Sequence, residues 1–177
     1  MGQISWTVES ITPETTLLEI PFHRSRAWEQ WVLVTSDRHI DNPHSLVDMQ
    51  LKHLEEAKRR NAPVIDLGDF LDAMQGRNDK RGRKGDLTQD VKKDVYFNAI
   101  VEDTYAKLEP YAKQFAILGR GNHEQSIVSK NEIDLLSILA YRLRSAGSKC
   151  VLAGYRGWIS IRFKRDIPMR SSRRNFV

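Results

Sequence analysis

Short apolar runs alternate with amphipathic stretches along most of the chain. The runs at 31–36, 64–69 and 115–118 are rich in aliphatic and β-branched residues, which is typical of strands buried on both faces of a sheet. After each run, apolar residues recur at the three- and four-residue spacing of a helix with one buried face. This order predicts an α/β fold, with a parallel βαβαβ core and helices on the sheet faces.

The expected helices have recognisable ends. The first is predicted over 45–61, where basic residues in the last turn suit the helix dipole. The second is predicted over 86–108, from a capping pair to the residues before Pro110. The third is predicted to begin with Asn131 as its N-cap and to stop at Gly147.

Period-two alternation marks the two ends of the chain. Apolar and polar residues alternate over 4–8 and 18–20, on either side of Pro13, which predicts a hairpin or a pair of edge strands. Apolar residues also occupy every second position of 159–164. That pattern predicts a late strand with one face in water.

Length and composition favour one soluble domain. The chain has 177 residues, 40% hydrophobic and 29% charged, and no apolar run approaches the roughly 20 residues of a membrane span. We expect one domain over 1–165 and a basic, disordered tail over 166–177. No signal-peptide pattern opens the sequence. We therefore expect a cytoplasmic protein without a membrane partner.

The positive charge is local. Residues 76–85 carry five basic side chains and one acidic one, and the tail is also rich in arginine. The segment 76–85 could attract an anionic substrate, or it could be a solvated loop, and the sequence leaves both interpretations open.

Three polar segments follow the three expected buried strands. They are Asp37-Arg38-His39, Gly68-Asp69-Phe70-Leu71-Asp72 and Gly121-Asn122-His123-Glu124. Because α/β proteins build their sites at the carboxyl ends of strands, these segments are expected to converge. If 37–39 is extended, Asp37 and His39 project to one side and Arg38 to the other. Carboxylates with imidazoles suit Mn, Fe or Zn, and the sequence does not choose among them.

The order of these segments resembles the signature of the calcineurin-like metallophosphoesterases, over residues 37–124. The amino-acid sequence around Asp37 and Asn122 is most similar to that of phage and prophage members of the superfamily. The resemblance implies an α/β sandwich that hydrolyses phosphomonoesters or phosphodiesters with a two-metal centre.

Carried over residue by residue, the resemblance assigns roles to five side chains. It gives Asp37 and His39 to the first metal, Asp69 to a bridge between the metals and Asn122 to the second metal. His123 then protonates the leaving group.

Further residues are expected to support the site, the first two of them because the resemblance implies it. Asp72 is expected to orient His123, and Glu124 to fix its loop. Asp41 is expected to support the site or to form a turn before Asn42. The candidate phosphate contacts are Arg77, Lys80 and Arg120. His44 is expected at the surface, with an approach to the site as the alternative.

The sequence departs from the family pattern in two ways. No histidine follows His123, whereas the family supplies further ligands from a downstream Gly-His-x-His element. We therefore expect the C-terminal part of the fold to be incomplete, and one of the two divalent ions to be retained. In addition, Ala73 stands where protein Ser/Thr phosphatases carry an arginine, which argues against that class.

Two other functions remain open at this point. One is a DNA or RNA nuclease of the same superfamily, with nucleic acid as its partner. The other is a catalytically silent fragment that binds a metal or a phosphate. The substrate and the oligomeric state are not determined by the sequence.

Overall fold

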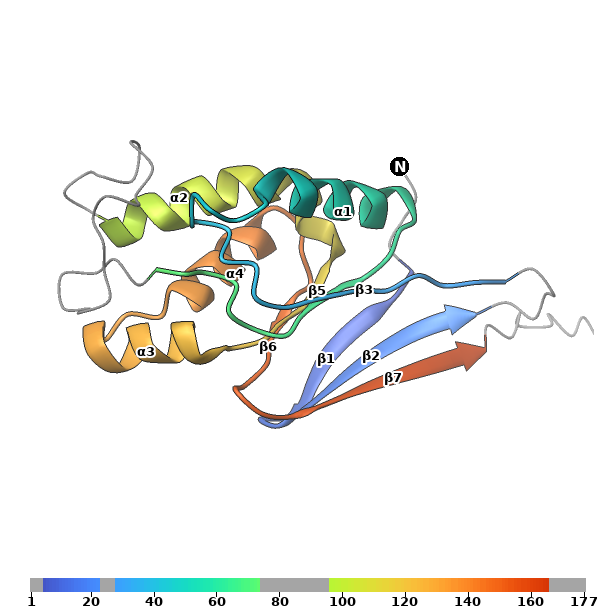
Figure 1. Ribbon diagram of the computed structural model, residues 1–177. Coiled ribbons are helices and arrows are strands. Elements are labelled where there is room, and N and C mark those ends of the chain that lie inside the picture. The colour runs from blue at the N-terminus through green and yellow to red at the C-terminus, as the bar shows by residue number, and fades with distance from the viewer. Residues whose placement is uncertain (1–4, 23–27, 74–95, 166–177) are drawn as a thin grey trace, which may run out of the picture.

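A computed structural model describes residues 5–22, 28–73 and 96–165 (Figure 1). The expectations for the basic segment with Arg77 and Lys80, for the start of the second helix and for the tail lie outside the described residues.

The described elements open with three strands, continue with helices between strands, and end with two strands. In order they are β1 (Thr7–Thr12), β2 (Thr15–Phe22), β3 (Leu33–Thr35), α1 (Val47–Arg59), β4 (Val64–Asp66), α2 (Tyr96–Leu108), the 3-10 helix η3 (Glu109–Gln114), β5 (Phe115–Leu118), α3 (Asn122–Asn131), α4 (Leu135–Ser145), β6 (Val151–Leu152) and β7 (Trp158–Arg165). Within the described ranges, no helix combines the length and the apolar character needed to cross a bilayer.

The strands form two sheets. The first has the order β3-β4-β5-β6 with every neighbouring pair parallel, which confirms the expected parallel core. The second has the order β1-β2-β7, in which β1 and β2 form the expected antiparallel hairpin and β7 runs parallel to β2. The protein is thus a mixed α/β structure.

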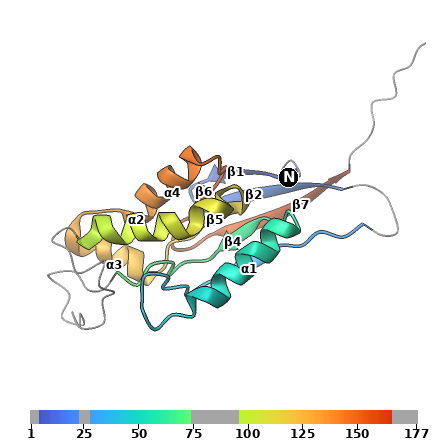
Figure 2. The ribbon, with the colours of Figure 1, turned by 90° about the horizontal axis from the view of Figure 1, so that it is seen from above.

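Among the described residues, the helices that pack on the parallel sheet cover one face of it, so the expectation of helices on both sheet faces is wrong. Helices α1, α2 and α4 lie on one side of this sheet, and the second sheet lies on the other (Figures 1 and 2). The inner strands are apolar on both faces: Val64 and Phe115 pack in the helix-side core, while Ile65 and Ile117 pack with Leu18 between the sheets. A second sheet buries that face as well as helices would.

Two strands are more exposed than their patterns predict. The strand expected at 31–36 is the three-residue edge strand β3, and Val34 is 54% exposed rather than buried. On β7, Ile161 and Phe163 are 41% and 53% exposed, although they pair with the fully buried Leu18 and Ile20 of β2. Both departures have the same cause. Strands β3 and β7 lie at sheet edges, where no further strand of the described chain covers them on the outer side.

The helix boundaries after β5 also differ from the expectation. Asn131 ends α3 instead of capping the next helix, and the N-cap of α4 is Asp134, whose carboxylate accepts a 3.0 Å hydrogen bond from Ser137 N. Helix α3 was not expected from the sequence. Its signal is a capping pair, since Glu124 lies three residues after the N-cap Gly121 and accepts a hydrogen bond from its N–H.

Candidate metal centre

The site forms where β3, β4 and β5 end side by side in the parallel sheet. Beyond the strands, the loop after β3 runs along the loop after β4. Asp37 N donates to Gly68 O at 3.0 Å, and His39 N donates to Asp69 O at 3.2 Å. The ladder therefore continues past the strands and brings the first two motifs together.

Asp37, His39 and Asp69 adopt left-handed backbone conformations, as does Ala73 farther along the second loop. The φ angles are +52° at Asp37, +43° at His39 and +53° at Asp69. The segment 37–39 is therefore not extended, as the sequence analysis assumed. Such conformations cost about 1–3 kcal/mol each in non-glycine residues and concentrate at functional sites.

The first donor group consists of Asp37, His39 and Asp69. One potential ligand atom from each of these residues lies within 4.8 Å of the others. Two carboxylates and one imidazole suit a divalent cation such as Mn, Fe or Zn. The residues present therefore fit the first metal of the expected centre.

The second donor group shares His39 and adds Asp72 and His123. Nδ1 of His123 lies 3.2 Å from Oδ1 of Asp72, and Nδ1 of His39 lies 3.7 Å from the same oxygen. The two imidazole rings are 4.5 Å apart between centroids. One carboxylate oxygen thus faces both histidines.

The position of His123 is fixed by the start of α3. Its backbone N–H donates to Asp69 Oδ1 at 2.9 Å, and its Nδ1 lies 2.9 Å from the backbone carbonyl of Asp72. Burial lowers the pKa of His123, but its bonds to Asp72 and the negative charges of Asp69 and Asp72 outweigh burial, and the net shift is upward. The hydrogen bond with His123 is the main cause that lowers the pKa of Asp72, with Asn42 contributing.

Asn42 is a site residue that the sequence analysis missed. Its Nδ2 donates to Asp72 Oδ2 at 2.7 Å, and its Oδ1 accepts from His44 N at 2.8 Å. This contact holds one oxygen of Asp72 so that the other faces the histidines. The Asn-Pro pair signals a turn, but nothing local indicates a partner thirty residues away.

Glu124 ties the second and third motifs together. Its carboxylate is buried and accepts backbone hydrogen bonds from Gly121 (2.8 Å), Leu71 (3.0 Å) and Asp69 (3.2 Å). These bonds satisfy N–H groups of both loops, which is the loop-fixing role that the resemblance implies.

Asp41 supports the far end of the second motif. Its carboxylate accepts from the backbone N–H groups of Asp72 at 2.6 Å and Ala73 at 2.9 Å. Burial raises the pKa of Asp41, and these two bonds partly offset the rise. The contacts favour the supporting role over a simple turn.

Beneath the site lies a buried ion pair. Arg38 Nε donates to Asp66 Oδ2 at 2.9 Å and to Thr35 Oγ1 at 3.2 Å, and the side chains of Arg38 and Asp66 are 2% and 0% exposed. Burial raises the pKa of Asp66 to about 6, against the opposing effect of Arg38. Arg38 therefore points inward and leaves Asp37 and His39 free to face the cleft.

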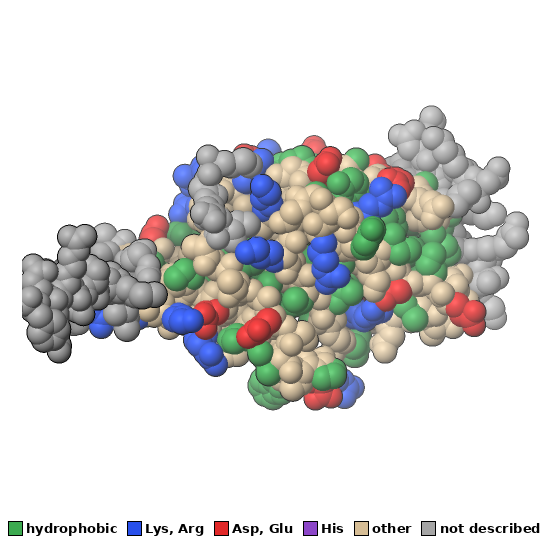
Figure 3. Space-filling view, turned by 180° about the vertical axis from the view of Figure 1, so that it is seen from behind, with side chains coloured by type: hydrophobic (Ala, Val, Ile, Leu, Met, Phe, Trp, Pro, Cys, Tyr) green, Lys and Arg blue, Asp and Glu red, His purple; other side chains and the backbone are tan. Residues whose placement is uncertain are grey.

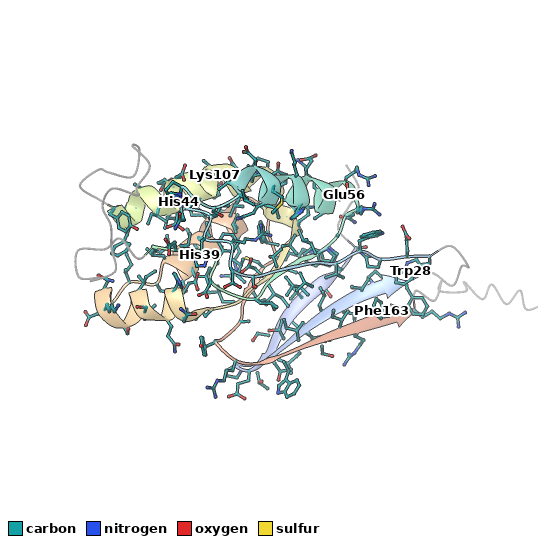
Figure 4. All side chains as sticks on the ribbon, viewed as in Figure 1. Trp28, His39, His44, Glu56, Lys107 and Phe163 are labelled. Atoms are coloured by element: carbon teal, nitrogen blue, oxygen red, sulfur yellow. The ribbon has the colours of Figure 1, made fainter. Side chains whose placement is uncertain are left out.

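An open cleft of about 410 Å³ exposes the site. It is lined by Asp37, Arg38, His39, Asn42, His44, Ser45, Asp72 and His123. His44 therefore lies at the site as well as at the surface. It occupies the same end of the molecule as His39, away from Trp28 and Phe163 (Figure 4). From behind, no described histidine is in view among the scattered charges (Figure 3).

Two further expected site residues lie at the starts of α4 and α3. Arg120 forms an ion pair with Asp134 at the start of α4, so its guanidinium is already engaged. Asn122 is the first residue of α3, and its side chain is exposed beside His123.

Comparisons with known proteins find no match: no protein-family model, no curated protein and no solved structure is similar enough to this chain. The functional assignment depends on the geometry of the site and on the order of its motifs.

Proposed function

We propose that this chain is a metal-dependent phosphoesterase of the calcineurin-like type, acting on phosphomonoesters or phosphodiesters. The observation that carries the proposal is the convergence of two donor groups, sharing His39, at the ends of three neighbouring parallel strands. The two aspartates that line the cleft, Asp37 and Asp72, would repel an anionic substrate unless bound cations offset their charge.

The residues divide into metal ligands and a proton donor. Asp37, His39 and Asp69 would hold the first ion, and Asp69 with Asn122 would contribute to a second. Divalent cations at such a centre neutralise phosphate oxygens and lower the pKa of a water molecule. That chemistry requires a rigid ligand frame, to which the buried hydrogen bonds of Glu124 contribute.

His123 is suited to protonate the leaving group. Its Nδ1 is engaged by Asp72, which leaves Nε2 as the ring nitrogen available to a substrate in the cleft. The raised pKa of His123 keeps the ring protonated closer to neutral pH. An acid with a pKa near the working pH transfers its proton most effectively.

The experiment is hydrolysis of an aryl phosphodiester and an aryl phosphomonoester in Mn²⁺, with wild type, Asp69→Asn and Asp48→Asn. Asp48 is an exposed carboxylate in the first turn of α1 and serves as the control. We expect turnover by wild type and Asp48→Asn, and background rates for Asp69→Asn. Equal rates for wild type and Asp69→Asn would contradict the proposal.

A further inference from the structure

The two donor groups that share His39 differ in chemistry. The first offers two carboxylates and one imidazole, whereas the second offers the imidazoles of His39 and His123 with the carboxylate of Asp72. Nitrogen-rich donor sets favour zinc over manganese, because imidazole suits later transition metals and carboxylate suits Mn. The second group is therefore chemically a better zinc site than the first.

The spacing of the second group matches zinc coordination. Two donors bound to one tetrahedral zinc at the usual Zn–N and Zn–O lengths lie about 3.4 Å apart. The separations from Asp72 Oδ1 are 3.2 Å to His123 Nδ1 and 3.7 Å to His39 Nδ1. One ligand atom each of His39, Asp72 and His123 also lies within 4.8 Å of the other two, close enough for one ion to bind all three after small side-chain shifts.

An unsatisfied atom points to the same site. Nδ1 of His39 is buried and has no hydrogen-bond partner in the described part of the chain. Its separation from Asp72 is too long for a hydrogen bond. Buried polar atoms without a partner are uncommon and call for an explanation such as an ion. Coordination would satisfy this nitrogen.

We propose that His39, Asp72 and His123 form a zinc site that inhibits the enzyme. Zinc bound here would take the place of the proton on Nδ1 of His123, which now faces the backbone carbonyl of Asp72 at 2.9 Å, and that proton would be released to solvent. The ion would also engage the carboxylate that orients the ring. The cleft lined by these residues gives the ion access. The inhibition rests on the proposed function, because zinc on Nδ1 would turn the His123 imidazolium into a neutral, metal-bound imidazole whose Nε2–H is a much weaker acid. The binding of zinc does not rest on that function.

The test measures Zn²⁺ affinity of metal-free protein by competition with a chromophoric chelator. Variants Asp72→Asn and His123→Gln each remove one ligand of the proposed site, and Asp37→Asn removes a ligand of the first group only. We expect Zn²⁺ binding to be weaker by about tenfold or more in each of the first two variants, and to change less in Asp37→Asn, because the first group is the poorer zinc site. Circular dichroism confirms that each variant is folded. Zn²⁺ affinity that responds to Asp37→Asn but not to the other two changes would overturn the proposal.

A second measurement separates this proposal from the proposed function. Zn²⁺ is titrated into wild type hydrolysing an aryl phosphodiester in saturating Mn²⁺, and inhibition is expected over the same Zn²⁺ range as binding. If zinc binds through Asp72 and His123 but no hydrolysis occurs in Mn²⁺, the phosphoesterase assignment and the inhibitory role fail and the zinc site stands. Hydrolysis that zinc leaves unchanged at saturation of this site would refute the inhibitory role alone.

Discussion

A Cβ atom added to Gly121 would lie 2.0 Å from Oδ1 of Asp69 and 2.3 Å from its backbone nitrogen. The φ angle of Gly121 is −96°, which any residue can adopt. Space, rather than backbone conformation, therefore requires glycine at this position. The third motif packs so closely on the second that its N-cap touches the proposed bridging carboxylate.

Gly121→Ala is therefore expected to displace Asp69 and weaken Mn²⁺ binding by about tenfold or more, measured by isothermal titration calorimetry. The matched control is Gly154→Ala, because a Cβ there meets its nearest atom at 3.4 Å, an ordinary contact. Equal Mn²⁺ affinity in the two variants would show that the close packing does not position the ligand.

His123→Gln is expected to lower kcat by about 10²- to 10⁴-fold, the usual contribution of a general acid. Mn²⁺ affinity should be retained, because His123 lies outside the first donor group. Steady-state kinetics on a substrate with a poor leaving group provides the measurement. A kcat close to that of wild type would remove His123 from the reaction.

Asn42→Ala is expected to lower kcat by about tenfold, since a hydrogen bond to a charged group contributes about 1.5–3 kcal/mol. Asn42→Asp should be more harmful, because it places a carboxylate against Oδ2 of Asp72, where Asn42 now donates at 2.7 Å. Comparing kcat and KM of the two variants tests the positioning role. Asn42→Asp with the activity of wild type would contradict it.

The buried ion pair predicts a pH-dependent stability. The pKa of Asp66 rises from 3.8 to about 6 on folding. The folded chain therefore holds this proton more tightly than the unfolded chain, and the resulting stability is present at low pH and lost as the pH rises through about 6. Arg38→Met removes the partner and leaves the charged form of Asp66 uncompensated above that range.

We expect Arg38→Met to reduce the free energy of unfolding by about 3–5 kcal/mol near pH 8, and by less near pH 5. Urea unfolding at the two pH values measures both losses. The double variant Arg38→Met with Asp66→Leu should recover much of the loss, because no buried charge remains. A larger loss at the lower pH would contradict the account.

The parallel core and the three motifs could be predicted from the sequence, because the strands, the helices and the motifs each have a local pattern. Continuous apolar runs marked β4 and β5, and parallel strands must end at the same edge of a sheet. Asp37, Asp69 and His123 therefore had to lie near one another. The exposure of β3 and β7 could not be predicted in this way, because a strand's place at an edge depends on its neighbours.

The contacts that support the site were harder to predict from the sequence. The bond from Asn42 to Asp72 and the pairing of Arg120 with Asp134 join residues that no local pattern relates. Helix α3 was missed for another reason. Its first residues were interpreted as a loop motif, although Glu124 also carries the signal of a helix start.

The account depends above all on Asp37, His39 and Asp69 holding a divalent cation together. Mn²⁺ titration of the metal-free chain, followed by electron paramagnetic resonance of free Mn²⁺, tests this directly. We predict saturable Mn²⁺ binding by wild type and by the surface variant Asp48→Asn. The Mn²⁺ affinity of Asp37→Asn should be lower than that of wild type by about tenfold or more. Absence of saturable binding by wild type, or equal binding by Asp37→Asn, would contradict the account.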